Sequence, residues 1–252
     1  MTQPAYSNAS TGSVDISGAW TATCHAPAAS GRIIILQVYQ AGTTSAAVTF
    51  TSATNITNLA ATANQWTKIG TTNAVGAVGL QHIWIGRSTG TSAPTFTGGN
   101  STSDDVYWRF YEFTNGNTGS TLSDVIQNVT NGVSVNGSGT SASVLDTAVT
   151  TTRSDCLALN FIACNDQPQA AELTAMTGGT GGTWTYPVTA YGTTTGTNGT
   201  IALVTAEMPV AGTIDGSSDA ITSVAWGVVG FALIGTTIDA DSFPYTGGGY
   251  YP

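Results

Sequence analysis

The sequence predicts an all-β protein, a jelly-roll-like β-sandwich of about ten strands with at most one short helix. Short runs of branched and aromatic residues recur along the chain and are bounded by Gly or Asn. Between them Thr, Ser, Asn and Gly predominate, and Thr suits exposed sheet because its branched β-carbon fits a pleated surface. Hydrophobic residues make up 41% of the 252 residues and charged residues only 8%. The chain can therefore fill a core, but uncharged polar side chains must cover its surface.

Strand signals in the first half begin after Gly31. The run Arg32–Tyr39 is β-branched and too apolar for a surface helix, which indicates a central strand of a packed sheet. Val106–Phe113 carries aromatic residues on both of its faces, so we expect it to be covered on both sides or to line an interface. Further strands are predicted at Val48–Thr51, Gln65–Ile69 and Leu80–Gly86.

The middle of the chain, residues 114–147, is rich in Asn, Gly, Ser and Thr. Within it Leu122–Val129 has helical spacing, with Ser120 or Thr121 as a cap and Gly132 as a stop. An extended crossing loop is the alternative. Strands then resume at Asp155–Cys164, Trp184–Tyr191, Ile201–Glu207 and Trp226–Ile234.

The predicted organisation is one β-sandwich domain over residues 31–234. Residues 1–30 form an N-terminal arm or first strand, and residues 235–252 form a C-terminal tail. No segment has the composition of a linker, because low charge and high Thr content continue throughout. The stretch 131–147 is the expected midpoint, dividing the strands into two halves of one sandwich, since about five short strands do not make a stable domain alone.

The charge pattern argues against nucleic acid and anionic membranes as partners. The net charge is −9, from 14 acidic and 5 basic residues, whereas phosphate binding requires clustered Lys and Arg. The cations are scattered singly at Arg32, Lys68, Arg87, Arg109 and Arg153. No stretch approaches the roughly 18 apolar residues of a membrane span, and the first ten residues lack the features of a signal peptide. We therefore expect folding in a cytoplasm.

The three cysteines are Cys24, Cys156 and Cys164. They contain no Cys-x-x-Cys pair of the kind found in zinc or redox sites. Cys156 and Cys164 lie in one strand run at an even separation, so they point to the same face about 26 Å apart and cannot bridge each other. Buried free thiols are the simpler expectation, and a disulfide from Cys24 to either of the others is the alternative.

No catalytic site can be identified from the sequence, and we expect the protein not to be an enzyme. Neither histidine, His25 or His82, neighbours a Gly-x-Ser-x-Gly nucleophile motif, and a surface or core role is simpler for both. A glycosidase needs two carboxyl groups roughly 5 to 10 Å apart. The candidates are Glu112, Glu172, Glu207 and Asp166.

Paired aspartates and surface tyrosines are the remaining candidate binding residues. No cofactor is expected apart from a possible Ca²⁺ ion, since loop carboxylates suit that cation, and solvated turn carboxylates are the default interpretation of these residues. The candidate pairs are Asp104 with Asp105, Asp215 with Asp219, and Asp239 with Asp241. Six Trp and nine Tyr could build a glycan-stacking face or serve as packing. In the tail, Tyr245, Tyr250 and Tyr251 are expected to anchor on a neighbouring molecule.

The order of several short motifs resembles that of β-sandwich proteins found among the structural proteins of tailed phages. In that group a Gly-Asp-x-Leu-like strand precedes a Gly-Trp-Thr-x-Ile turn, an x-x-Trp-x-Arg strand, a Tyr-Arg-x-Tyr strand and late strands near a small-residue repeat. The similar segments are Gly31–Tyr39, Gln65–Ile69, Ile83–Arg87, Tyr107–Tyr111, Thr151–Leu157 and Ala211–Ile214. The likeness covers about residues 31–234. It departs at Arg32, which replaces an acidic residue, and the tail has no counterpart.

This resemblance implies a structural protein of the virion, assembled in the host cytoplasm, and no catalytic residues. Capsid decoration or cement proteins, head spikes or fibres, and tail-associated subunits are the expected roles. The partners would be other virion proteins such as the major capsid protein, together with further copies of the chain, a trimer being favoured. The alternative is a carbohydrate-binding or host-recognition adhesin, and a glycoside hydrolase is the third hypothesis.

Overall fold

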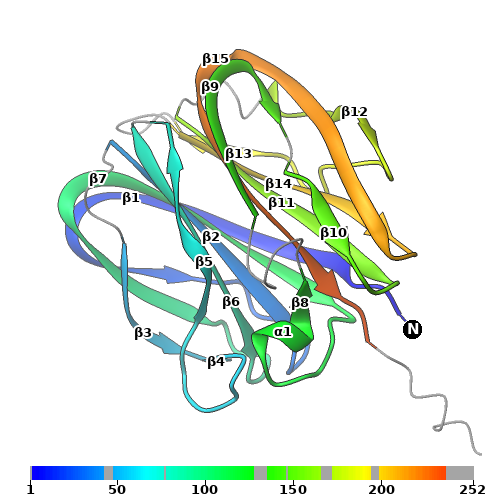
Figure 1. Ribbon diagram of the computed structural model, residues 1–252. Helices are drawn as coiled ribbons and strands as arrows, with labels where there is room; N and C mark the ends of the chain where they lie inside the picture. Colours follow the sequence, from blue (N-terminus) through cyan, green and yellow to red (C-terminus); the bar gives the residue numbers. More distant parts are fainter. Residues whose placement is uncertain are drawn as a thin grey trace, which may run out of the picture.

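The computed structural model describes residues 2–42, 48–76, 78–127, 135–145, 147–165, 172–193 and 199–236. These residues form fifteen strands and one four-residue helix, so the predicted all-β sandwich is confirmed (Figure 1). More strands are present than the ten expected, because pieces as short as Ile56–Thr57 pair through their backbone without a periodic sequence signal. The helix in the described part of the chain is far too short to cross a membrane.

The first sheet is built from residues 5–114. Its strands are β1 (Ala5–Thr23), β2 (Ile33–Ala41), β3 (Thr49–Thr54), β4 (Ile56–Thr57), β5 (Thr67–Val75), β6 (Gly79–Ser88) and β7 (Thr95–Thr114). The main strands are antiparallel in the order β1-β7-β2-β6, with β3 paired to β7 and both β4 and β5 paired to β6. The long strand β1 therefore lies at one edge of this sheet, within the segment expected to be an arm or a first strand.

The second sheet is built from residues 126–234. Its strands are β8 (Ile126–Gln127), β9 (Val135–Leu145), β10 (Val149–Thr151), β11 (Cys156–Cys164), β12 (Thr177–Thr180), β13 (Tyr191–Thr193), β14 (Gly199–Met208) and β15 (Gly212–Ile234). Here the antiparallel order is β9-β15-β11-β14, followed by β13. The main strands β9, β11, β14 and β15 thus repeat the order in which β1, β2, β6 and β7 build the first sheet.

The boundary between the two halves lies earlier than the sequence suggested. It falls between Thr114 and Ile126, whereas the expected midpoint was 131–147. Within that stretch, Val135–Leu145 forms β9, which pairs with β15 over ten residue pairs. Its Gly- and Ser-rich sequence is typical of a loop, but ladder hydrogen bonds use backbone groups and do not require apolar side chains.

Apolar side chains form three main layers. The central layer, between the sheets, joins residues such as Ile35 and Tyr111 of the first sheet to Leu159 and Phe231 of the second. A second layer covers the outer face of the first sheet and a third covers the outer face of the second. Accordingly β2 and β11 are buried along their whole length.

The outer layers exist because the long strands bend back over their own sheets, as β1 and β7 do together on one side of Figure 1. The far ends of these strands place Trp20 against Phe96, and Phe96 against Trp84, on the outer face of the first sheet. The bend coincides with a register shift between Ile16 and Gly18, where Gly18 adopts φ 111°. A positive φ of this kind is accessible to glycine at little cost.

Polar side chains bridge the two sheets inside the central layer. Gln37 of β2 donates its amide N–H to the carbonyl oxygen of Ile162 at 2.7 Å and accepts the hydroxyl of Tyr111 at 2.8 Å. Gln81 of β6 donates to the carbonyl oxygen of Phe161 at 2.9 Å. Each buried apolar side chain contributes about 1.5 to 3 kcal/mol and each hydrogen bond about 1 kcal/mol. Apolar packing therefore drives the sheets together, and the amides fix their alignment.

Two sequence predictions require correction. The predicted helix begins at its expected cap, Thr121, but spans only Leu122–Val125, because the next residues pair with β15 as β8. The predicted strand Trp184–Tyr191 is wrong: up to Ala190 the segment makes a single bridge, from Thr185 to Thr205, before β13 begins. Pro187 has no N–H for a ladder, and Trp184 packs on the outer layer of the second sheet.

The other predicted strands are confirmed, although two are much longer than expected. The predicted strand Val106–Phe113 lies within the 20-residue β7, and Trp226–Ile234 is the final part of the 23-residue β15. The expectation that Val106–Phe113 is covered on both faces is also correct. Phe110 lies in the outer layer and Tyr111 in the central layer.

The cross-sheet amides can be tested by truncating one of them. Gln37→Ala should lower the free energy of unfolding by about 3 kcal/mol, because it opens a cavity and leaves the Tyr111 hydroxyl and the Ile162 carbonyl without this partner. Chemical denaturation followed by tryptophan fluorescence measures the change. The matched control is Gln65→Ala at an exposed position, where little change is expected. Equal effects of the two substitutions would contradict a structural role for Gln37.

Candidate functional site

Two of the candidate catalytic residues, His25 and Glu112, lie in contact. We call the group Ser10, His25, Arg32 and Glu112 the Glu112 cluster. One carboxylate oxygen of Glu112 lies 2.9 Å from His25 Nε2, and the other lies 3.4 Å from Arg32 Nε. The hydroxyl of Ser10 accepts the backbone N–H of His25 at 2.9 Å and lies 3.4 Å from its Nδ1. The arrangement joins a hydroxyl, an imidazole and a carboxylate.

Burial favours a structural role for this cluster. The Glu112 side chain is 1% exposed and that of His25 is 13% exposed. Glu112 also accepts the backbone N–H of Ala28 at 3.3 Å, so its two oxygens hold the segment after β1 against the sheet. A buried carboxylate needs such partners, because leaving it unpaired costs several kcal/mol.

The neighbouring thiol of Cys24 is also a poor nucleophile. It lies 3.5 Å from His25 Nδ1, but burial raises the pKa of Cys24 to about 12, so the reactive thiolate is scarce at neutral pH. Burial likewise raises the pKa of Cys156 to about 11 and raises that of Cys164. All three thiols are free and buried, as expected from the sequence. Cys24 packs on the outer face of the first sheet and the other two on that of the second, which explains why they do not pair.

His82 is a core histidine on β6. Its ring stacks on Trp84 with centroids 5.3 Å apart, and its Nδ1 lies 3.3 Å from the hydroxyl of Thr72. Burial, with a smaller contribution from Lys68, lowers the pKa of His82 to about 3. The ring is therefore neutral throughout the physiological pH range and does not take up a proton there, so it is poorly suited to acid–base catalysis.

The paired aspartates do not form a metal cluster in the part of the chain that is described. Asp219 is 6% exposed and accepts hydrogen bonds from the backbone N–H groups of Thr174 and Ala175 and from the hydroxyl of Tyr186. Among the described residues, no three His, Cys, Asp or Glu side chains gather as metal ligands. Calcium binding therefore stays a prediction.

The other candidate aspartates and the tail tyrosines lie at different places in the chain. Asp215 is exposed on β15 and Asp105 is buried on β7. Asp104 belongs to the backbone of β7, and its side chain is outside the description. Outside the described residues altogether are Asp166, Asp239, Asp241, Tyr245, Tyr250 and Tyr251.

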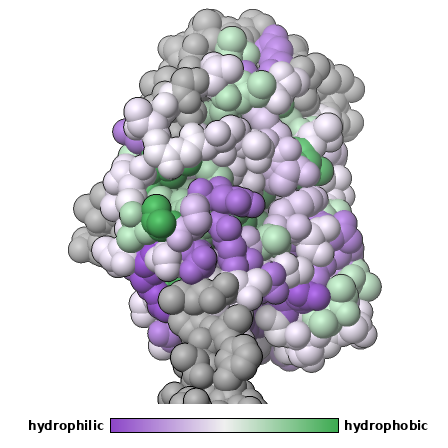
Figure 2. Space-filling view, turned by 90° about the vertical axis from the view of Figure 1, so that its right-hand side faces the viewer, coloured by the Kyte–Doolittle hydropathy of each residue, from purple (hydrophilic) through white to green (hydrophobic). Residues whose placement is uncertain are grey.

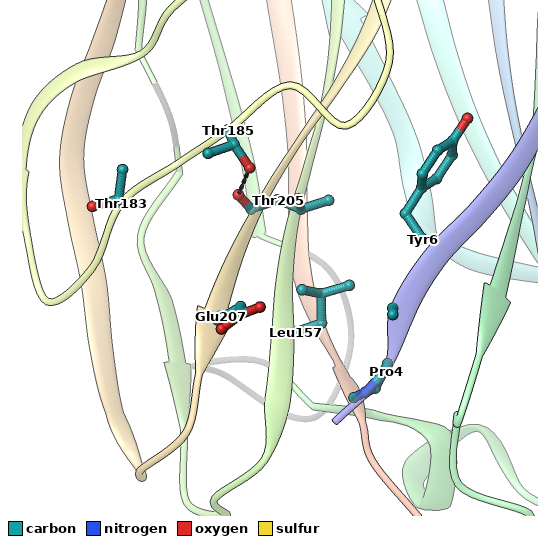
Figure 3. A pocket seen from close by; sticks show the side chains of 8 residues that line it. Pro4, Tyr6, Leu157, Thr183, Thr185, Thr205 and Glu207 are labelled. Atoms are coloured by element: carbon teal, nitrogen blue, oxygen red, sulfur yellow. Dashed lines mark hydrogen bonds between the residues drawn. The ribbon is translucent and has the colours of Figure 1, made fainter. Parts of the chain in front are cut away.

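An open hollow lies between the edge strand β1 of the first sheet and β14 of the second. We call it the β1–β14 hollow; its volume is about 380 Å³. Figure 3 shows Tyr6 on one side, Thr205 and Glu207 on the other, and Leu157 between them. The residues that line it are Pro4, Ala5, Tyr6, Leu157, Thr183, Thr185, Thr205 and Glu207. Two other hollows, beside Arg32 and beside Leu59, have no carboxylate in their linings.

The sequence identified only one residue of this hollow, Glu207. The threonines carried no signal, because Thr is the commonest kind of surface residue in this chain and nothing in the local pattern marks these positions. Tyr6 falls within the first thirty residues, for which an unattached arm was one of the alternatives. The hollow exists only because β1 and β14 come together from opposite ends of the chain.

The structural role of Glu112 can be distinguished from a catalytic one by comparing two carboxylates. Glu112→Gln should lower the free energy of unfolding by about 1 to 3 kcal/mol, because Arg32 loses the charge that compensates it and His25 loses its contact with a carboxylate oxygen. Glu207→Gln, at an exposed position, should leave stability unchanged. Urea denaturation of both variants measures this. Unaltered stability of the Glu112 variant would mean that the cluster does not hold the fold.

His82 should make stability depend on pH. Its pKa is lowered from 6.5 to about 3 in the folded protein, so between these values the unfolded chain binds a proton that the native chain does not. The free energy of unfolding should therefore decrease by about 1.4 kcal/mol per pH unit as pH falls through this interval. His82→Phe removes this contribution and leaves the carboxylates unchanged. If the free energy of unfolding of the wild-type protein and of His82→Phe depended on pH in the same way, His82 would not be the source of this pH dependence.

Comparison with known proteins gives no match for this chain. No protein-family model fits it, and neither a curated protein nor a solved structure is significantly similar to it. What is established is therefore the fold, an all-β sandwich, and the geometry of its sites.

Proposed function

We propose that this protein is a structural component of a phage particle, a capsid decoration, cement or spike-like subunit that acts by surface binding and assembly. The observation that carries the proposal is the combination of a fully layered sandwich with a low proportion of charged residues. Three apolar layers lie within one chain, while only 8% of its residues are charged. A well-packed domain whose surface is mostly uncharged and polar suits a role in packing against neighbours.

The surface supports contacts through hydroxyl and amide groups. Among the described residues the only large hydrophobic side chain that is exposed is Val210, at 70%. Figure 2 shows one face on which pale and purple side chains predominate and the green ones are scattered. Polar interfaces of this kind rely on many repeated copies for strength, because each contact is weak. We propose the major capsid protein and further copies of this chain as partners, and the virion as its location.

The long outer strands also favour assembly. Strand β1 offers 19 residues at the edge of the first sheet, and free edges of sheets tend to be covered by a symmetric neighbour. The resemblance of the motif order to that of phage structural proteins supports this proposal. A homotrimer is the assembly that we favour.

A second candidate function is recognition of a glycan. The β1–β14 hollow favours it, since it is open, lined by hydroxyl groups and flanked by an aromatic ring. A glycosidase has less support. The side chains next to Glu112 along β7, Tyr111 and Phe113, lie in the central layer, so Glu112 points to the outer face of the first sheet. Glu207 lines the hollow between the sheets, and the two carboxylates do not converge.

Solution mass and particle binding test the proposed function. Light scattering of the purified chain should give a mass above that of the 25.5 kDa monomer, and the chain should sediment with phage particles that lack it. Bovine serum albumin added to the same particles controls for trapping. A stable monomer that stays in the supernatant would contradict the proposal.

A further inference from the structure

We propose that the β1–β14 hollow binds a neutral saccharide. This inference rests on the second proposed function, glycan recognition, and adds to it the site and the chemical class of ligand. It does not depend on association with a particle.

The walls of the hollow are held in place by the secondary structure around it. One wall is the start of β1, at the edge of the first sheet, and the other is β14 with the segment that contains Thr183 and Thr185. Thr185 and Thr205 are held together by two backbone hydrogen bonds of 2.8 Å each. Both walls therefore belong to the hydrogen-bonded framework, and the volume of about 380 Å³ lies in the range of small-molecule pockets.

Hydroxyl groups and one carboxylate supply the polar contacts. The hydroxyls of Thr183 and Thr205 can donate and accept hydrogen bonds, which matches the mixed character of sugar hydroxyls. The hydroxyl of Thr185 donates to the carbonyl oxygen of Thr205 at 3.4 Å (Figure 3) and can still accept a hydrogen bond. The carboxylate of Glu207 is exposed and has no hydrogen-bond or ion-pair partner among the described residues. Hydrogen bonds from ligand hydroxyls to a charged acceptor of this kind are the stronger ones.

An apolar surface for the carbon face of a sugar ring is also present. The ring of Tyr6 is kept in place by an edge contact with Phe113, with centroids 6.3 Å apart and an interplanar angle of 77°. Leu157, between the walls, is 5% exposed. Tyrosine offers rigid, amphipathic contact area at low cost in conformational entropy.

The charges nearby favour a neutral ligand over an acidic one. Glu207 would repel a carboxylate, sulfate or phosphate group in the hollow. Arg109, a cation that interacts electrostatically with Tyr6, is 5% exposed, donates to the carbonyl oxygen of Thr189 and lies over the ring of Tyr111 at 5.5 Å. Because Arg109 is buried and engaged in this way, it is not available to an anionic ligand.

The test is a glycan array that carries neutral, acidic and amine-bearing oligosaccharides, followed by titration calorimetry on the best neutral ligand. The variants are Glu207→Gln and Thr205→Val, each of which removes one polar group at nearly constant volume. Asp215→Asn and Thr51→Val make the matched changes at exposed positions on β15 and β3. Circular dichroism and urea denaturation confirm that each variant is folded.

The expected result is binding of a neutral glycan that Glu207→Gln weakens about tenfold or more and Thr205→Val about fivefold, with both controls unchanged. If the wild-type protein binds a neutral glycan and the hollow variants bind it equally well, glycan recognition stands and this site is wrong. Binding of acidic or amine-bearing glycans alone overturns the ligand class. Binding of no glycan overturns this inference and glycan recognition together, and leaves particle association to its own test.

Discussion

The packing of β2 against β11 is the constraint on which the rest of the structure depends. Both strands are central in their sheets, and all nine residues of each are buried. A strand buried along its whole length needs apolar cover on both faces. In a sandwich of two flat sheets, the outer faces of both sheets would be exposed to solvent. The long strands β1, β7 and β15 supply that cover by bending back over their own sheets. Three apolar layers follow from two exceptionally apolar strands.

The same strand order in both sheets shows one structural solution used twice. The first sheet has the order β1-β7-β2-β6, and the second has the corresponding order β9-β15-β11-β14. In each sheet the longest strand therefore lies between the first and the second main strands of its half. In both, the last strand is the longest and provides the bend, with 20 residues in β7 and 23 in β15. The halves differ in what joins them across the centre. The first supplies the amides of Gln37 and Gln81, and the second supplies the backbone carbonyl groups of β11 that accept from them.

The polar groups of this protein divide into two classes by burial. Glu112, His82 and Asp219 lie inside, and hydrogen bonds or stacking contacts hold each of them in place. Their chemistry is used to stabilise the fold. Glu207, Thr183 and Thr185 of the β1–β14 hollow lie at the surface, where a ligand can reach them. This separation is why the recognition of another molecule at the surface, rather than turnover at a buried cluster, is the function that we propose.

The sequence by itself determined the fold class and most of the strands, and it favoured free thiols over a disulfide from Cys24. Alternating and β-branched runs such as Arg32–Tyr39 and Asp155–Cys164 report local burial, which is a property of a few neighbouring residues. The tertiary structure alone decided that Glu112 meets His25, that β9 is a strand and that Tyr6 faces β14. These contacts join residues 87 apart for the Glu112 pair and about 200 apart for the hollow. Their physical reason is the order in which strands pair, and that order depends on backbone hydrogen bonds that are alike at every residue and leave no mark in the sequence.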